Sequence, residues 1–146
     1  IPRFDEKPWR TVRDALAGMP DPRGCDTGMF LNHVFQGDAR IYPGHTGSPL
    51  DLPAKTLKAG DHGVPGGENM MILANGDVRY FSVRESARLQ TFPDGYFFHG
   101  SWTETMRQLG NAVPVMLGRQ VAASVAMGLI ESELYKHVGL NKKRYA

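Results

Sequence analysis

The sequence predicts a mixed α+β fold in which a β-hairpin accompanies several helices and a long irregular segment. Two apolar runs, 70–73 and 78–81, flank Asn75-Gly76, a residue pair that supplies the left-handed conformation of a tight hairpin turn. Helices are indicated by Ser and Thr at capping positions and by apolar residues three to four apart near the end of the chain. The 146 residues are enough to bury a hydrophobic core.

The part of the chain before the hairpin is predicted to contain little regular structure. Thr11 is the expected N-cap of a short helix over 12–17. The segment 29–35 is compatible with either a helix or a strand. Glycine and proline are frequent between 37 and 67, and irregular regions of this length are often functional. Within that region, the alternation of residues 54–59 predicts one strand.

Two further helices are predicted directly after the hairpin. Ser82, with Glu85 three residues later, has the pattern of a capping box for a helix over 83–90. Ser101 is the expected cap of the next helix, which should end at residue 106 or 109. Gly110 then belongs to a turn that separates this helix from the last one.

The last helix is predicted to bury one edge. Pro114 is suited to its first turn, and apolar residues recur at helical spacing: Leu117, Val121, Val125 and Leu129, with Ala122, Ala126 and Ile130 beside them. No apolar run is expected to reach the length of about 20 residues that a membrane span needs. No membrane contact is therefore expected.

The cysteine and histidine residues exclude several kinds of site, whereas the net charge excludes none. With 17 Lys and Arg against 15 Asp and Glu, the net charge of +2 neither requires nor opposes a nucleic-acid partner. The single cysteine, Cys25, excludes an intrachain disulfide and a cysteine-based zinc cluster, and it indicates a reducing compartment. The spacing of His33, His99 and His137 is not that of metal ligands, so these are expected to be surface or hydrogen-bonded side chains.

Four segments carry a resemblance to a known family. Residues 82–94, SVRESARLQTFPD, resemble the ninth conserved block of the DNA cytosine-5 methyltransferases, and residues 108–114, QLGNAVP, resemble their tenth and last block. Residues 53–60, PAKTLKAG, are similar to the part of the family's target-recognition region that carries a Thr-Leu pair. Residues 9–15, WRTVRDA, resemble the helix that usually leads into that region.

The resemblance implies a division of the chain into two parts. Residues 1–100 would be a small DNA-recognition domain, with the hairpin 70–81 and the ninth-block helix 83–90. Residues 101–146 would carry the tenth-block loop and a C-terminal helix that packs on the Rossmann-like α/β domain of a class I methyltransferase.

The activity implied by the resemblance is methyl transfer from S-adenosylmethionine to carbon 5 of cytosine in double-stranded DNA. A cysteine thiolate adds to carbon 6 in such enzymes, and the target base is flipped out of the duplex. The family's cofactor loop, Pro-Cys-Gln nucleophile, Glu-Asn-Val element and eighth block do not occur in these residues, and the first residue is Ile. We therefore expect an N-terminal catalytic domain or subunit as a partner, a chain that is inactive alone, and a bacterial cytoplasmic location.

The resemblance also implies which residues contact DNA. Thr56 and Leu57 are the pair expected near the flipped nucleotide, where the hydroxyl bonds a phosphate and the leucine fixes the loop. The other candidates are Lys55, Lys58, Arg40, His45 and His62. The alternative for Thr56 and Leu57 is an ordinary strand without a role in binding.

Two more groups of residues are assigned by the resemblance. Asn111, Ala112 and Val113 would contact the methionine part of S-adenosylmethionine, through the backbone at Ala112, where many relatives have Ser. Arg84, Glu85 and Arg88 would form a structural scaffold for the recognition region, with Glu85 paired to Arg88 at helical spacing. Phosphate contact by these arginines is the alternative.

Two other function classes remain open at this stage. One is a non-catalytic DNA-binding module or regulatory subunit derived from the same fold. The other is a helical-hairpin interaction domain, which explains the helices but not the long glycine-rich loop.

Overall fold

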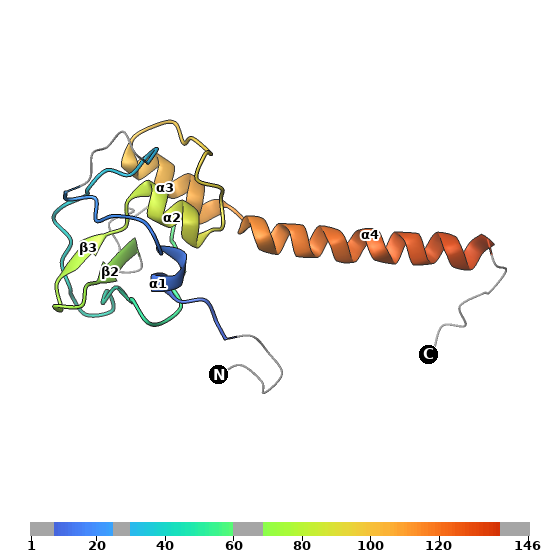
Figure 1. Ribbon diagram of the computed structural model, residues 1–146, viewed down its shortest axis with the longest axis horizontal. Coiled ribbons are helices and arrows are strands. Elements are labelled where there is room, and N and C mark those ends of the chain that lie inside the picture. The colour runs from blue at the N-terminus through green and yellow to red at the C-terminus, as the bar shows by residue number, and fades with distance from the viewer. Residues whose placement is uncertain (1–7, 25–29, 60–68, 138–146) are drawn as a thin grey trace. The chain divides into compact units, whose positions relative to one another are not determined.

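The structure of the chain is a computed structural model that describes residues 8–24, 30–59 and 69–137 (Figure 1). It has the mixed α+β composition that the sequence predicts. The elements in chain order are α1 (Val12–Ala15), β1 (Ser48–Pro49), β2 (Met70–Ile72), β3 (Val78–Tyr80), α2 (Val83–Leu89), α3 (Trp102–Asn111) and α4 (Val115–His137). The chain divides into two compact units, Ile1–Ala112 and Val113–Ala146, which are described separately.

The sheet is small and is built around the predicted hairpin. Its order is β1-β2-β3, with β2 antiparallel to β3 and β1 parallel to β2. The hairpin turn is closed by a hydrogen bond of 2.8 Å from Leu73 N to Asp77 O. Gly76 takes a φ of 87° there, a conformation that glycine adopts without strain. The predicted hairpin is therefore confirmed.

The prediction of a strand over 54–59 is wrong. In the structure, this segment has no strand pairing, because its backbone amides bond to side chains instead of a neighbouring strand. Lys55 N donates to Ser48 Oγ at 3.1 Å, and Lys58 N donates to Asn69 Oδ1 at 3.3 Å.

The predicted helices are present, with changed ends. α1 and α2 both begin with a complete capping box, Thr11 with Asp14 and Ser82 with Glu85. α1 ends at Ala15 instead of residue 17. α3 continues through Asn111, so the first residues of the expected turn, Gly110 and Asn111, belong to the helix.

The segment 29–35, for which helix and strand were both open, is neither over its described part, 30–35. Asn32 has a φ of 61°, which interrupts any regular element. Its side chain exchanges two hydrogen bonds of 2.9 Å with the backbone of Phe98. The segment is therefore held by a distant loop.

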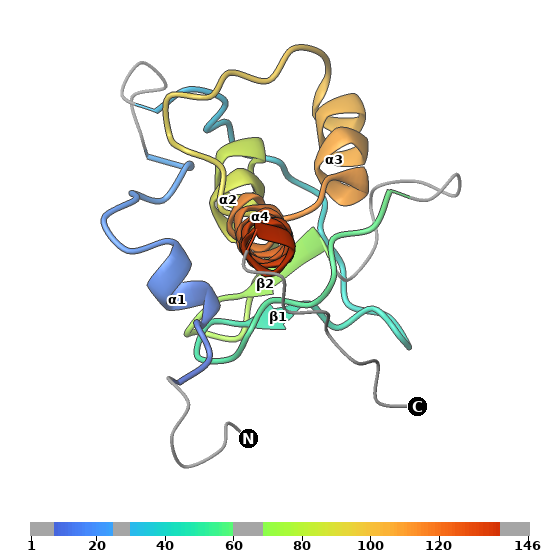
Figure 2. The ribbon, with the colours of Figure 1, turned by 90° about the vertical axis from the view of Figure 1, so that its right-hand side faces the viewer.

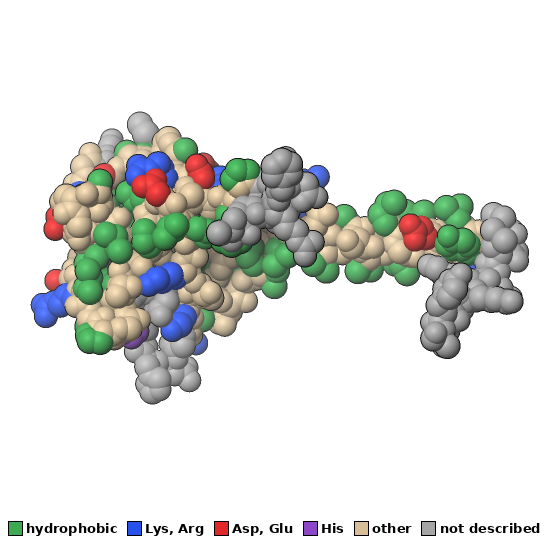
Figure 3. Space-filling model, turned by 90° about the horizontal axis from the view of Figure 1, so that it is seen from below, with side chains coloured by type: hydrophobic (Ala, Val, Ile, Leu, Met, Phe, Trp, Pro, Cys, Tyr) green, Lys and Arg blue, Asp and Glu red, His purple; other side chains and the backbone are tan. Residues whose placement is uncertain are grey.

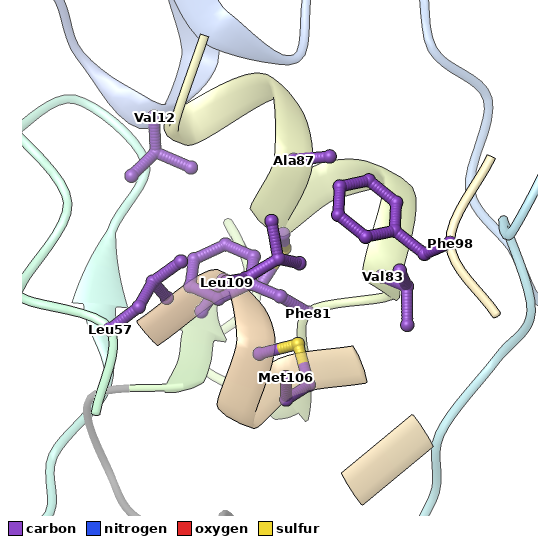
Figure 4. Close-up of a cluster of buried hydrophobic side chains, with 9 residues drawn as sticks. Val12, Leu57, Phe81, Val83, Ala87, Phe98, Met106 and Leu109 are labelled. Atoms are coloured by element: carbon purple, nitrogen blue, oxygen red, sulfur yellow. The ribbon is translucent and has the colours of Figure 1, made fainter. Parts of the chain in front are cut away.

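The core of the first unit lies between the sheet and the helices α2 and α3, which lie on the same side of the sheet (Figures 1 and 2). Its buried side chains come from α1, the segment 54–59, the hairpin, α2, the loop before α3 and α3 itself: Val12, Leu57, Met71, Phe81, Val83, Ala87, Phe98, Met106 and Leu109 (Figure 4). Two of them, Leu57 and Leu109, belong to the predicted recognition segment and the tenth block. The core therefore connects the predicted recognition segment with the tenth block.

The described part of the second unit is α4 with the two residues before it, and α4 has exposed apolar side chains on all sides. The predicted edge is exposed, with Leu117 at 54% and Leu129 at 64% of full exposure, and so are Met116, Met127 and Leu134 on other sides. Hydrophobic side chains cover much of the described α4 surface in Figure 3. The expectation about membrane-length runs was wrong: Trp102–Lys136 includes a helical window of mean hydropathy 1.5, long and apolar enough to cross a membrane by length and composition alone.

Candidate functional site

The predicted recognition segment alternates between exposed and buried side chains. Thr56 and Lys58 are exposed, whereas Leu57 is only 6% exposed and belongs to the core. Figure 4 shows Leu57 near Phe81, which directly follows β3. Leu57 is thus anchored in the core, and the two polar side chains beside it face solvent.

Two buried polar side chains hold the backbone of this segment. Ser48, which is fully buried, accepts from Lys55 N, and the Lys55 ammonium donates to Thr46 Oγ1 at 2.6 Å. Asn69, 1% exposed, accepts from Lys58 N at 3.3 Å and donates to Lys58 O at 3.5 Å. The segment is therefore fixed on both sides of Thr56.

A tight turn next to this segment contains another candidate, His45. Tyr42 and His45 exchange backbone hydrogen bonds of 3.3 and 2.8 Å, and their rings stack with centroids 4.2 Å apart. Thr46 connects this turn to the Lys55 ammonium. Arg40 is exposed two residues before the turn. The last candidate, His62, lies outside the described residues.

The ninth-block helix is tied to its surroundings by two ion pairs, neither of which is the predicted one. The expected pairing of Glu85 with Arg88 is wrong. Glu85 points back to the N-cap, as a capping box requires, and there it receives two hydrogen bonds of 2.7 and 2.6 Å from the buried Arg79. Arg88 pairs with Asp94 at 2.8 and 2.7 Å. This contact lowers the pKa of Asp94 below its ordinary value.

Arg84 is fully buried and donates to the backbone of two loops. Its guanidinium bonds to Leu31 O at 2.8 Å, to Pro93 O at 3.1 Å and to Tyr96 O. Burial lowers the pKa of Arg84. A guanidinium in this position is occupied by carbonyls and has no exposed surface for a phosphate. Arg84 therefore connects α2 to the backbone at Leu31 and at Pro93 and Tyr96.

His33 contributes a further buried connection. It is 1% exposed, with Nε2 2.9 Å from Pro20 O and Nδ1 2.8 Å from Ser82 Oγ. Because the carbonyl can only accept, Nε2 carries a proton, and in the neutral imidazole Nδ1 then accepts from the hydroxyl. The prediction of a hydrogen-bonded histidine is confirmed. Its role of joining the α2 cap to residue 20 had no signal in the sequence.

The three residues expected at the cofactor lie at the end of α3. Asn111 is its last residue and is exposed, and Ala112 follows as a half-buried C-cap with φ −75° and ψ 143°. Val113 is the first residue of the second unit. Pro114 O accepts the first hydrogen bond of α4 from Gly118 N at 2.9 Å, so Pro114 stands at the start of the helix.

Gly110, inside α3, is where this helix meets the recognition segment. A β-carbon added to Gly110 would lie 2.8 Å from Lys58 C and Ala59 N, and 2.9 Å from Ala59 Cβ. Such distances are too short for van der Waals contact. Sequence reasoning interpreted Gly110 as a turn residue and missed this contact. The sequence carries no signal for this contact, because a glycine before Asn and Pro is typical of a turn.

Comparison with known proteins indicates one family. The model of the family described as C-5 cytosine-specific DNA methylase matches residues 36–126. Among similar proteins, type II methyltransferase M.AplI of Arthrospira platensis is 41% identical over 81 residues, which are 55% of this chain and 24% of that protein. Type II methyltransferase M.SacI of Streptomyces achromogenes is 30% identical over 158 residues, 86% of this chain and 40% of that protein.

A eukaryotic relative shows the same partial coverage. DNA (cytosine-5)-methyltransferase 1 of Mus musculus is 40% identical over 68 residues, which are 47% of this chain and 4% of that protein. The chain thus spans well under half the length of each of these relatives.

Proposed function

The chain belongs to the C-5 cytosine-specific DNA methylase family, and we propose that it supplies the target-recognition region and one wall of the cofactor pocket of a DNA cytosine-5 methyltransferase. In this proposal, residues 1–100 are the recognition domain. Residues 101–146 carry the tenth-block segment and the helix that packs on a Rossmann-like catalytic domain. The nucleophile and the main cofactor motifs then belong to another part of the enzyme.

The observation that carries the proposal is the arrangement of residues 56–58. Leu57 is buried in the core, while Thr56 and Lys58 are exposed on either side of it. A hydroxyl and an ammonium are groups that bond to phosphates and base edges in duplex DNA. A segment fixed by its own core residue presents them at a defined position, which recognition of a base sequence requires. Lys55, Arg40 and His45 would add contacts around it.

The residues at the end of α3 fit a polar ligand. Asn111 carries an exposed amide that can donate and accept, and the extended backbone at Ala112 leads away from the helix. With Val113, these residues would hold the methionine part of S-adenosylmethionine, which supplies the methyl group when bound. Since Ala112 has no hydroxyl, its contact would be through the backbone.

The all-round apolar surface of α4 supports the presence of a partner domain. A helix that is hydrophobic on every side is normally buried in a larger core or in a membrane. Within its own unit, α4 is exposed from Arg119 to Lys136. We assign this surface to the catalytic domain, because the helix follows the tenth block directly.

The proposal is tested by methyl transfer onto duplex DNA with the chain alone and with a catalytic portion that contains the Pro-Cys-Gln motif. We expect no transfer by the chain alone and transfer by the combination, with loss of activity in Thr56→Ala. Methyl transfer by the 146-residue chain alone would contradict the proposal. Salt-sensitive DNA binding without activity in either mixture would instead indicate the non-catalytic binding module.

A further inference from the structure

We infer that Gly110 is a positioning residue for target recognition, because its missing side chain lets the backbone at Lys58–Ala59 lie directly against the last turn of α3. This inference rests on the proposed function of residues 56–58. It adds a residue of the tenth block, which the family resemblance places at the cofactor, to the determinants of DNA sequence preference.

Backbone conformation does not explain a glycine at this position. Gly110 lies inside α3, and it is not among the described residues with positive φ. At such a position, alanine is the more favourable helix former, because glycine loses more conformational freedom. The reason for glycine must therefore be a contact.

The contact involves atoms that cannot rotate away as the end of a flexible side chain can. Two of the three atoms nearest to an added β-carbon are backbone atoms, Lys58 C and Ala59 N, each at 2.8 Å. The third, Ala59 Cβ at 2.9 Å, is attached rigidly to the same backbone. A methyl group at Gly110 would therefore have to displace either the helix or the segment.

The surrounding anchors determine which of the two moves. On the helix side, Leu109 is fully buried, and Gln90 Nε2 donates to Leu109 O at 2.9 Å. On the segment side, Leu57 is held in the core, whereas the hydrogen bonds between Lys58 and Asn69 are long, 3.3 and 3.5 Å. Because the segment after Leu57 has the longer of these hydrogen bonds, a methyl group would move Lys58 and its neighbours before it moved the helix end.

The inference is tested with Gly110→Ala in the full-length protein that contains this chain. The recognised sequence is first defined by methylation of a random duplex library with the wild-type protein. Affinities are then measured for a duplex with this sequence and for one without it, together with the thermal midpoint. Gly95→Ala is the matched control, because no atom lies within 4 Å of its added β-carbon and its φ is not positive.

We expect Gly110→Ala to reduce the ratio of specific to non-specific affinity roughly tenfold, as for the loss of one good base contact. Non-specific affinity and its salt dependence should stay as in the wild type, because no phosphate-binding cation is removed. A purely structural role would lower both affinities by the same factor. That result, or an unchanged ratio in folded protein, would overturn the inference.

Ala59→Gly tests the same contact without creating a clash, in case Gly110→Ala does not fold. It removes the β-carbon next to Gly110, so the segment loosens, and the ratio should fall several-fold with little change in the thermal midpoint. An unchanged ratio in Ala59→Gly would overturn the inference even if Gly110→Ala were unfolded. Failure of the proposed function is distinguishable, since wild-type protein would then show no sequence preference or methyl transfer.

Discussion

Replacing Arg84 by Met is predicted to destabilise the first unit strongly. Methionine keeps an unbranched side chain in the buried space and removes all three hydrogen bonds to the loops. Those bonds reach Leu31, Pro93 and Tyr96, so one side chain connects α2 to two segments without regular structure. No other described side chain replaces these donors.

The magnitude follows from two opposing contributions. A hydrogen bond from a charged group contributes about 1.5–3 kcal/mol. Part of this is regained, because the substitution also removes a buried charge that has no direct carboxylate partner among the described residues. In addition, Leu31, Pro93 and Tyr96 are themselves exposed, so their carbonyls can become hydrated. We therefore expect a net loss of about 3 kcal/mol in the free energy of unfolding. For a unit of this size, that lowers the thermal midpoint by roughly 10 °C.

The assay is thermal and urea unfolding of Arg84→Met beside Arg107→Met. Arg107 is exposed and has a single ion pair, 3.4 Å from Glu104, so its removal should change the free energy of unfolding by less than about 0.5 kcal/mol. Arg84→Lys should recover less than half of the lost free energy of unfolding, because one ammonium cannot donate in the several directions of the planar guanidinium. The reasoning is refuted if Arg84→Met unfolds within about 2 °C of the Arg107→Met control.

Three more predictions follow from other contacts. Glu85→Gln removes the closest charge partner of the buried Arg79 and leaves it only the carboxylate of Asp21 at 4.0 Å among the described residues. It should cost about 3 kcal/mol in urea unfolding, and a cost below about 1 kcal/mol would contradict this. The hydrogen bond from Arg88 lowers the pKa of the Asp94 carboxyl group. The stabilisation of the fold by this contact is therefore fully present above the ordinary pKa of 3.8 and is lost as the pH falls through the lower pKa of the folded state. Asp94→Asn should remove that acid-dependent part of the unfolding profile. Val125→Glu should leave unfolding of the first unit unchanged and abolish co-purification with a catalytic portion, and retained co-purification would disprove docking through α4.

Local signals in the sequence predicted the elements that are determined by neighbouring residues. The hairpin depends on Asn75-Gly76, and the start of α2 depends on Ser82 and Glu85, so both could be located correctly. The end of α3 was placed too early, because Gly110 is a breaker by propensity. Packing against Lys58 and Ala59 provides a different reason for this glycine, and only tertiary structure shows it.

The contacts that hold the candidate site could not be predicted in the same way. Arg79 and Glu85 lie on different elements, and helical spacing favoured Arg88 as the partner instead. Asn69 holds Lys58 across a stretch of chain that carries no pattern. Similarly, the pattern of polar and apolar residues in 54–59 does indicate which side chains are buried. It cannot show that the backbone amides of this segment donate to side chains instead of to a neighbouring strand.

Under the proposed function, target recognition depends on the hydrophobic core. Leu57 and Leu109 belong to one buried cluster, and each is adjacent in sequence to a residue with a proposed contact role, Lys58 and Gly110. A core substitution such as Leu109→Ala therefore leaves a cavity beneath the last turn of α3, in addition to its general cost of about 2–5 kcal/mol. In protein that remains folded, such a cavity would allow the helix end and the segment to shift against each other. Sequence preference should then be lost at temperatures below the unfolding midpoint, whereas non-specific binding, which depends on exposed cations, should persist until the unit unfolds.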